Sequence, residues 1–123
     1  MGSGPSTSKS TFIIGDKPVE TAFMAVTELI KVANVGDIVE LGNNLFGIVT
    51  QKVGDTCKVA TSVNGKIQEV AIQNMANEGK INNSFDKTSA PYGSEKVVQN
   101  ARNFVGQIVS DSHSFVKKCR NGI

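Results

Sequence analysis

GDIVELGNNLFGIVTQKVGDTCKVATSVNGKIQEVAI, residues 36–72, contains four short runs rich in β-branched residues, and clusters of turn residues separate them. Runs of this kind are typical of antiparallel strands joined by hairpins. The predicted strands are residues 37–41, 46–53, 57–63 and 66–72. Together they predict a twisted antiparallel meander of four strands, with one face that other elements must cover.

The clearest turn in this stretch is Asn64-Gly65. A two-residue type I′ turn needs positive φ at both positions, and Asn followed by Gly tolerates that conformation best. The sequence therefore predicts a tight hairpin between the third and fourth predicted strands.

Amphipathic helices are predicted on both sides of the meander. Apolar residues recur at intervals of three and four over residues 18–33, and Pro18 suits a first helical turn. After a polar connection over residues 74–93, a second helix is expected over residues 95–109, with Ser94 as its N-cap. A last helix begins near Asp111 and ends at Gly122, with one side formed by Ser112, Phe115, Val116 and Cys119. The predicted fold class is α+β: a four-stranded antiparallel meander covered by helices, with an extra N-terminal helix.

The composition indicates one globular domain over residues 11–123. Residues 1–10, MGSGPSTSKS, have the composition of a disordered leader or a cloning scar. The net charge of +2 is too small for the strong surface potential of a dedicated nucleic-acid binder. No apolar run approaches the ~20 residues that span a bilayer, so no transmembrane segment is predicted and a cytoplasmic location is expected.

The reactive side chains are few. Cys57 and Cys119 lie far apart in the sequence and do not resemble a disulfide framework. With a single His and no thiol or carboxylate at ligand spacing, we expect no metal site, and no motif for a cofactor is present. Both cysteines are predicted to pack in the core.

Several segments occur in an order that resembles the lecithin:retinol acyltransferase-like family, within the NlpC-like superfamily. That family includes small phospholipase/acyltransferases and picornaviral 2A proteins of the H-box/NC type. The resemblance spans residues 36–122 and rests on short motifs whose order carries it: Gly36-Asp37-Ile38-Val39-Glu40, Val53-Gly54-Asp55, Ile81-Asn82-Asn83-Ser84-Phe85-Asp86, Phe104-Val105-Gly106-Gln107, Ser114-Phe115-Val116 and Arg120-Asn121-Gly122.

The resemblance implies a thiolate nucleophile at the start of the last helix, a His on the second strand that activates it, and a further His that orients the first. Aligned on Gly54-Asp55, these two His positions fall on Ile48 and Ala60. Aligned on Phe115-Val116, the nucleophile position falls on Ser112. All three chemical positions of the family are therefore lost in this chain.

Two routes to an active site remain open. Asp111, Ser112 and His113 are the members of a hydroxyl triad, but neighbouring residues on a helix point about 100° apart and do not face each other. The other interpretation is that Asp111 or Ser112 caps the helix while His113 lies in solvent. Cys119 shares a helix face with Ser112, two turns later, and is the second candidate nucleophile.

The sequence therefore favours a non-catalytic member of this fold that binds a partner. A protein partner is favoured, as for a viral 2A-type protein that engages a host factor; an anionic lipid or RNA is the alternative. Basic residues Lys117, Lys118 and Arg120 would form the weak contact for phosphate. The competing hypothesis is an active acyltransferase or phospholipase that uses Ser112 or Cys119.

Overall fold

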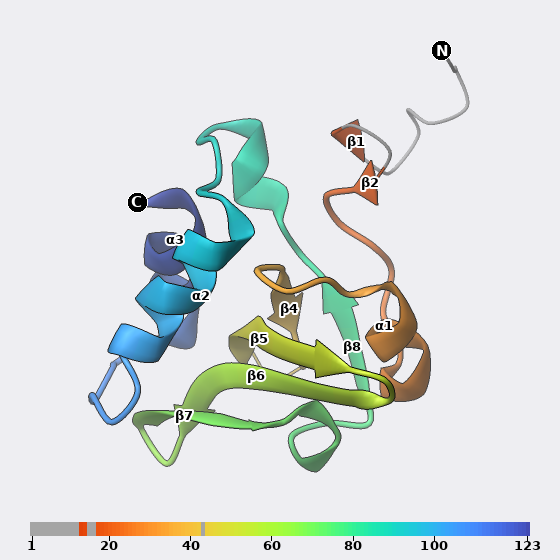
Figure 1. Cartoon of the computed structure of the whole chain (residues 1–123), viewed down its shortest axis with the longest axis horizontal. Helices are drawn as coiled ribbons and strands as arrows, with labels where there is room; N and C mark the ends of the chain where they lie inside the picture. Colours follow the sequence, from red (N-terminus) through yellow and green to blue (C-terminus); the bar gives the residue numbers. More distant parts are fainter. Residues whose placement is uncertain (1–12, 15–16, 43) are drawn as a thin grey trace.

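The computed structural model describes residues 13–14, 17–42 and 44–123, which form an α+β fold (Figure 1). The predicted leader over residues 1–10 lies outside the described residues. Within the described part, six strands form one antiparallel sheet in the order β3-β8-β4-β5-β6-β7. The elements are β1 (Ile13–Ile14), β2 (Lys17–Pro18), β3 (Met24–Ala25), α1 (Val26–Val32), β4 (Ile38–Glu40), β5 (Phe46–Val53), β6 (Thr56–Val63), β7 (Lys66–Ala71), the 3-10 helix η2 (Ile72–Asn74), β8 (Glu78–Ile81), the 3-10 helix η3 (Ser84–Lys87), α2 (Ser94–Asn103) and α3 (Ser112–Asn121).

The predicted meander is confirmed as the consecutive strands β4 to β7, which pair antiparallel in sequence order. Its last hairpin has the predicted turn, because Asn64 and Gly65 adopt positive φ angles of 55° and 85°. Both angles belong to a type I′ turn, whose twist matches that of the two strands it joins.

The prediction of a four-stranded sheet is wrong, because β3 and β8 extend the sheet beyond β4. β8 lies in the segment that was expected to be a polar connection. Its buried residue Gly79 has no side chain, so the strand lacks the alternating apolar pattern that would predict it. A Cβ at Gly79 would lie 2.9 Å from Leu29 Cδ2 and 3.0 Å from the carbonyl oxygen of Glu40, which shows how closely β8 packs there.

This close approach predicts the effect of Gly79→Ala. We expect the free energy of unfolding to fall by about 1–3 kcal/mol, because the added methyl group must displace Leu29 or the β4 backbone. Urea denaturation of both proteins measures the difference. Gly93→Ala is the matched control, since a Cβ at Gly93 meets no atom within 4 Å; it should cost only ~0.5 kcal/mol at this helix N-cap. Equal effects of the two changes would show that Gly79 is not sterically constrained.

The predicted helix over residues 18–33 is wrong in its first half. Pro18 belongs to β2, Met24 and Ala25 form β3, and only Val26–Val32 is helical. The backbone of the preceding segment pairs instead with β8, through hydrogen bonds such as Thr21 N–H to the Ile81 carbonyl. Phe23, which the helical pattern placed on an apolar face, is 48% exposed. The distant strand therefore overrides the local helical periodicity.

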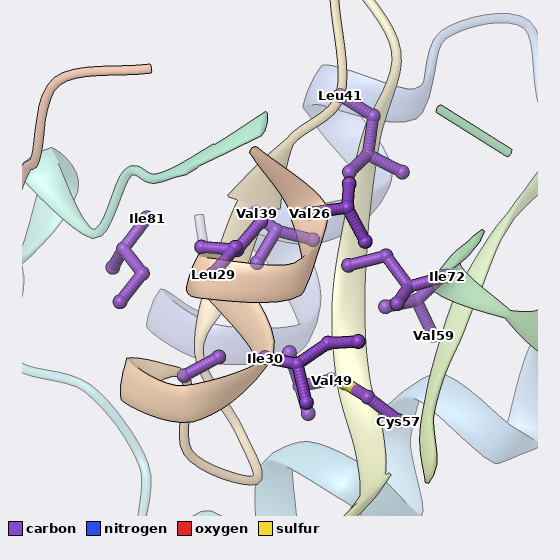
Figure 2. Packing of buried hydrophobic residues seen from close by; sticks show 11 residues of the cluster. Val26, Leu29, Ile30, Val39, Leu41, Val49, Cys57, Val59, Ile72 and Ile81 are labelled. Atoms are coloured by element: carbon purple, nitrogen blue, oxygen red, sulfur yellow. The ribbon is translucent and has the colours of Figure 1, made fainter. Parts of the chain in front are cut away.

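The sheet separates two hydrophobic clusters within the described residues. Successive strand residues point to opposite faces, so Val39 and Val49 pack on one face while Ile38 and Ile48 pack on the other. The first cluster lies under α1, and Figure 2 shows its side chains gathered between the helix and the strands. The second lies under α2 and α3, which stand on the side of the sheet away from α1 (Figure 1).

Helix α2 is shorter than the predicted helix over residues 95–109, since it ends at Asn103. Its N-cap is Gly93 rather than Ser94, which is the first helical residue. Gly106 has a φ of +90°, which a right-handed helix does not accommodate. The chain instead runs along β7, where Ile67 N–H donates to Gln107 O and Gly106 N–H donates to Ile67 O. Residues 106–109 thereby cover the first part of this outer strand.

The last helix is confirmed with its predicted caps. The Asp111 carboxylate accepts hydrogen bonds from the backbone N–H groups of His113 and Ser114, as an N-cap does. Gly122 closes the helix in the left-handed conformation, with a φ of 72°. None of the helices in the described part has the length and apolar character needed to cross a membrane.

Candidate functional site

Ser112, where the family resemblance places the nucleophile, joins the start of α3 to the start of β5. Its Oγ accepts a hydrogen bond of 3.0 Å from Phe46 N–H and donates one of 3.3 Å to the carbonyl oxygen of Asn44. The hydroxyl proton thus points to a carbonyl, which does not act as a base. The Ser112 side chain ties the helix to the sheet.

His113 does not lie in solvent as expected, because its ring is half-buried between two phenylalanines. The ring centroids lie 4.7 Å from Phe46 and 5.2 Å from Phe85. Asp111 is the N-cap of α3. The hydrogen bond from the Ser114 hydroxyl is the main reason that the pKa of the Asp111 carboxyl is lowered. Among the described residues, no hydrogen bond joins the imidazole to the Ser112 hydroxyl.

Ile48 and Ala60 are direct partners across the β5–β6 ladder. Both are fully buried in the cluster under α2 and α3. The two positions on which the resemblance places the family's imidazoles are therefore adjacent, and aliphatic side chains occupy both. Phe46, which contacts Ser112, belongs to the same cluster.

Cys119 is fully buried in this cluster as well. Burial raises the pKa of its thiol to about 12, against a smaller lowering by Lys118. Burial in the other cluster likewise raises the pKa of the Cys57 thiol, with Lys52 acting in the opposite direction. The raised pKa keeps both thiols protonated near neutral pH. Because the thiolate is the reactive form, neither cysteine is an activated nucleophile.

We expect both thiols to resist iodoacetamide while the protein is folded. Relative to an ordinary thiol, the raised pKa of Cys119 leaves about 1,000-fold less thiolate. Mass spectrometry of the intact protein should show no adduct near neutral pH and two adducts in concentrated guanidinium chloride. Rapid labelling of Cys119 in the folded protein, read from its peptide, would contradict the buried position.

The three basic residues of the last helix do not form one patch. Lys117 lies with its Nζ 5.2 Å from the centroid of the Phe85 ring, and Lys118 is exposed. Arg120 points inward, since its side chain is 14% exposed and pairs with Asp86.

Arg120 is the centre of a largely buried polar network that links α3 to η3 and to the segment just before β4. Its Nε and Nη2 donate to the two carboxylate oxygens of Asp86 at 3.1 and 2.7 Å. Its Nη1 donates to the carbonyl oxygen of Gly36 at 2.8 Å and lies 3.9 Å from Asp37 Oδ1. The bidentate pairing of Arg120 with Asp86 is the strongest geometry available to a guanidinium and a carboxylate.

Two asparagines complete the Arg120 network. Asn83 donates to Asp37 Oδ1 and accepts from Ile38 N–H, so it connects Asp37 to the start of β4. Asn121 donates to Asp86 Oδ1 and to the Ser89 carbonyl. Every charged member of the network belongs to a motif that carries the family resemblance, so those motifs meet in space although they are far apart in the sequence.

A cavity of about 380 Å³ opens beside this network. Its lining combines apolar residues of the N-terminal segment, α1 and β8 with the charged residues of the network: Val19, Thr21, Met24, Val32, Asp37, Ile81, Asn83, Asp86, Pro91 and Arg120. A hollow with mainly apolar walls and a few convergent polar groups is the usual form of a ligand site. The sequence did not predict this cavity; its only sign was that polar residues recur in the motifs around Asp37, Asn83 and Asp86.

No protein-family model matches the chain, and no curated protein matches it.

Proposed function

We propose that this chain is a non-catalytic member of the lecithin:retinol acyltransferase-like family and that it acts by binding. The observation that supports this proposal is the Ile48–Ala60 pair, which is fully buried where the family's chemistry needs two imidazoles. Support for the family itself comes from the order of the motifs and from the network that brings several of them together.

Acyl transfer needs a group that takes the proton from the attacking atom. An isoleucine and an alanine have no such group. Ser112 directs its proton to the Asn44 carbonyl, and a serine hydroxyl without a base is a weak nucleophile near neutral pH. Cys119 is enclosed among apolar side chains, where burial raises its pKa. Each candidate nucleophile therefore lacks activation for a separate physical reason.

We propose a protein as the partner rather than RNA or an anionic membrane. Phosphate binding by a protein depends on several basic side chains that face the same way. Arg120 is committed to Asp86 inside the fold, and Lys117 covers the Phe85 ring. The cluster of Lys117, Lys118 and Arg120 therefore presents too few basic side chains on one face to bind a phosphate backbone strongly.

Mass spectrometry of the intact protein tests the absence of catalysis. The protein is incubated with a phospholipid and with a p-nitrophenyl acyl ester, in parallel with Ser112→Ala and Cys119→Ala. We expect no acyl adduct that either substitution removes. An ester on Ser112 or a thioester on Cys119 that disappears in the matching variant would overturn the proposal and establish the rival acyltransferase.

Activated esters also acylate exposed lysines, so the test needs a chemical control. Neutral hydroxylamine cleaves thioesters rapidly but leaves lysine amides intact. An adduct that survives hydroxylamine and persists in both variants is surface amide formation, and it agrees with a non-catalytic chain.

A further inference from the structure

The walls of the 380 Å³ cavity suit the apolar body of a small ligand. Val19, Met24 and Ile81 line it from the N-terminal segment, β3 and β8, and Val32 lies at its rim with 47% of its surface exposed. Small-molecule sites range over about 300–1,000 Å³, so this cavity fits a small body. Its contact with solvent at Val32 provides a route of entry.

The polar end of the cavity has hydrogen-bond acceptors to spare. An ionised carboxylate offers about four acceptor positions. The Asp37 carboxylate accepts from Asn34 N–H and Asn83 Nδ2, and its remaining neighbour, Arg120 Nη1, is 3.9 Å away. Asp37 therefore retains acceptor positions for a donor that enters the cavity.

The described residues at this end carry a net negative charge. Two carboxylates, Asp37 and Asp86, stand against one guanidinium, Arg120, which leaves an excess of one negative charge among the described lining residues. A second group with the same balance joins Lys80 of β8 to Glu40 of β4 and to Glu20 of the segment before β3. An anion could accept hydrogen bonds from the remaining N–H groups of Arg120, but the carboxylates of Asp37 and Asp86 would repel it. The apolar walls strengthen these charge interactions, because they exclude water.

We infer that this cavity binds a small organic amine, with its apolar body against Val19, Met24 and Ile81 and its ammonium group at Asp37. An ammonium supplies three donors and one positive charge, which match the spare acceptors and the excess negative charge. Neither Ser112 nor Cys119 is among the described residues that line the cavity. Amine binding therefore stands or falls independently of the acylation experiment.

NMR titration of the ¹⁵N-labelled chain tests this site with three probes of equal length: hexylammonium, 1-hexanol and hexanoate. Hexylammonium should produce saturable shifts at the amides of residues that line the cavity, with a Kd on the order of 1 mM. Hexanoate should bind at least about tenfold more weakly, with hexanol between the two. Absence of saturable shifts, shifts located elsewhere, or hexanoate binding as tight as hexylammonium binding would overturn the inference.

Two variants and one control locate the binding. Val32→Trp places a large ring at the rim and should abolish the hexylammonium shifts, whereas Val53→Trp, at a 63% exposed position that does not line the cavity, should leave them unchanged. Asp37→Asn removes one negative charge and should reduce the preference for hexylammonium over hexanoate. Because Asp37 also holds the Arg120 network, the rim variant remains decisive if Asp37→Asn does not fold. Undiminished binding to Val32→Trp would exclude this cavity.

Discussion

Arg120→Leu should lower the free energy of unfolding by about 3–5 kcal/mol, the largest effect that we expect of any single substitution in this chain. The substitution removes the two hydrogen bonds to Asp86 and the one to Gly36. It also leaves the Asp86 carboxylate, whose side chain is only 4% exposed, without its positive partner. An unpaired buried charge is more costly than the lost attraction alone. Urea denaturation measures the loss.

Lys118→Leu is the matched control, because Lys118 is an exposed neighbour of similar length on the same helix. It should change the free energy of unfolding by no more than ~0.5 kcal/mol. The double variant Asp86→Leu with Arg120→Leu should recover part of the loss, since it removes both charges together. A single Arg120→Leu variant as stable as Lys118→Leu would show that the ion pair contributes nothing.

Ile48→Ala should lower the free energy of unfolding by about 2–5 kcal/mol. Ile48 is fully buried in its cluster. Ala60 is its cross-strand partner, and α2 and α3 pack above it. Removing three carbons there creates a cavity that the packed helices cannot easily fill. Thermal and urea denaturation both report the loss.

Val53→Ala tests whether burial is the cause, because Val53 lies on the same strand but is 63% exposed. It should cost under ~0.5 kcal/mol. If Ile48→Ala were equally mild, Ile48 would face an accessible hollow rather than a packed core. The site would then be open to small molecules, although Ile48 and Ala60 would still offer no group that takes a proton.

The sequence predicted the elements whose determinants are local. Strands β5 and β6 and the turn at Asn64-Gly65 follow from β-branched runs and turn chemistry within a few residues. The cap at Asp111 follows from a side chain and the two N–H groups next to it. Each of these interactions is formed almost entirely within one short segment.

The main errors in the predicted fold came from pairing between distant segments. β8 is buried through Gly79, which has no side chain to display a pattern, and the segment before α1 is strand-like because β8 pairs with it. The helix expected after Asn103 gives way to hydrogen bonds with Ile67. No local periodicity records such competition.

The same limit applied to the candidate sites. The family motifs placed the two imidazole positions on Ile48 and Ala60, and the β5–β6 ladder pairs these two residues. Sequence proximity grouped Arg120 with two lysines, although its true partner, Asp86, lies 34 positions earlier. A cavity built from the N-terminal segment, α1, β8, η3 and α3 leaves no contiguous trace in the sequence.

The contact between Arg120 and Gly36 spans 84 positions, so it also bears on how the chain is made. During translation, the meander is complete about fifty residues before Arg120 is synthesised. Asp86 is made 34 residues before Arg120 and lacks its cation until then, and the sheet face that α3 covers stays open to other molecules. We therefore expect the nascent chain to remain prone to aggregation until its last helix emerges.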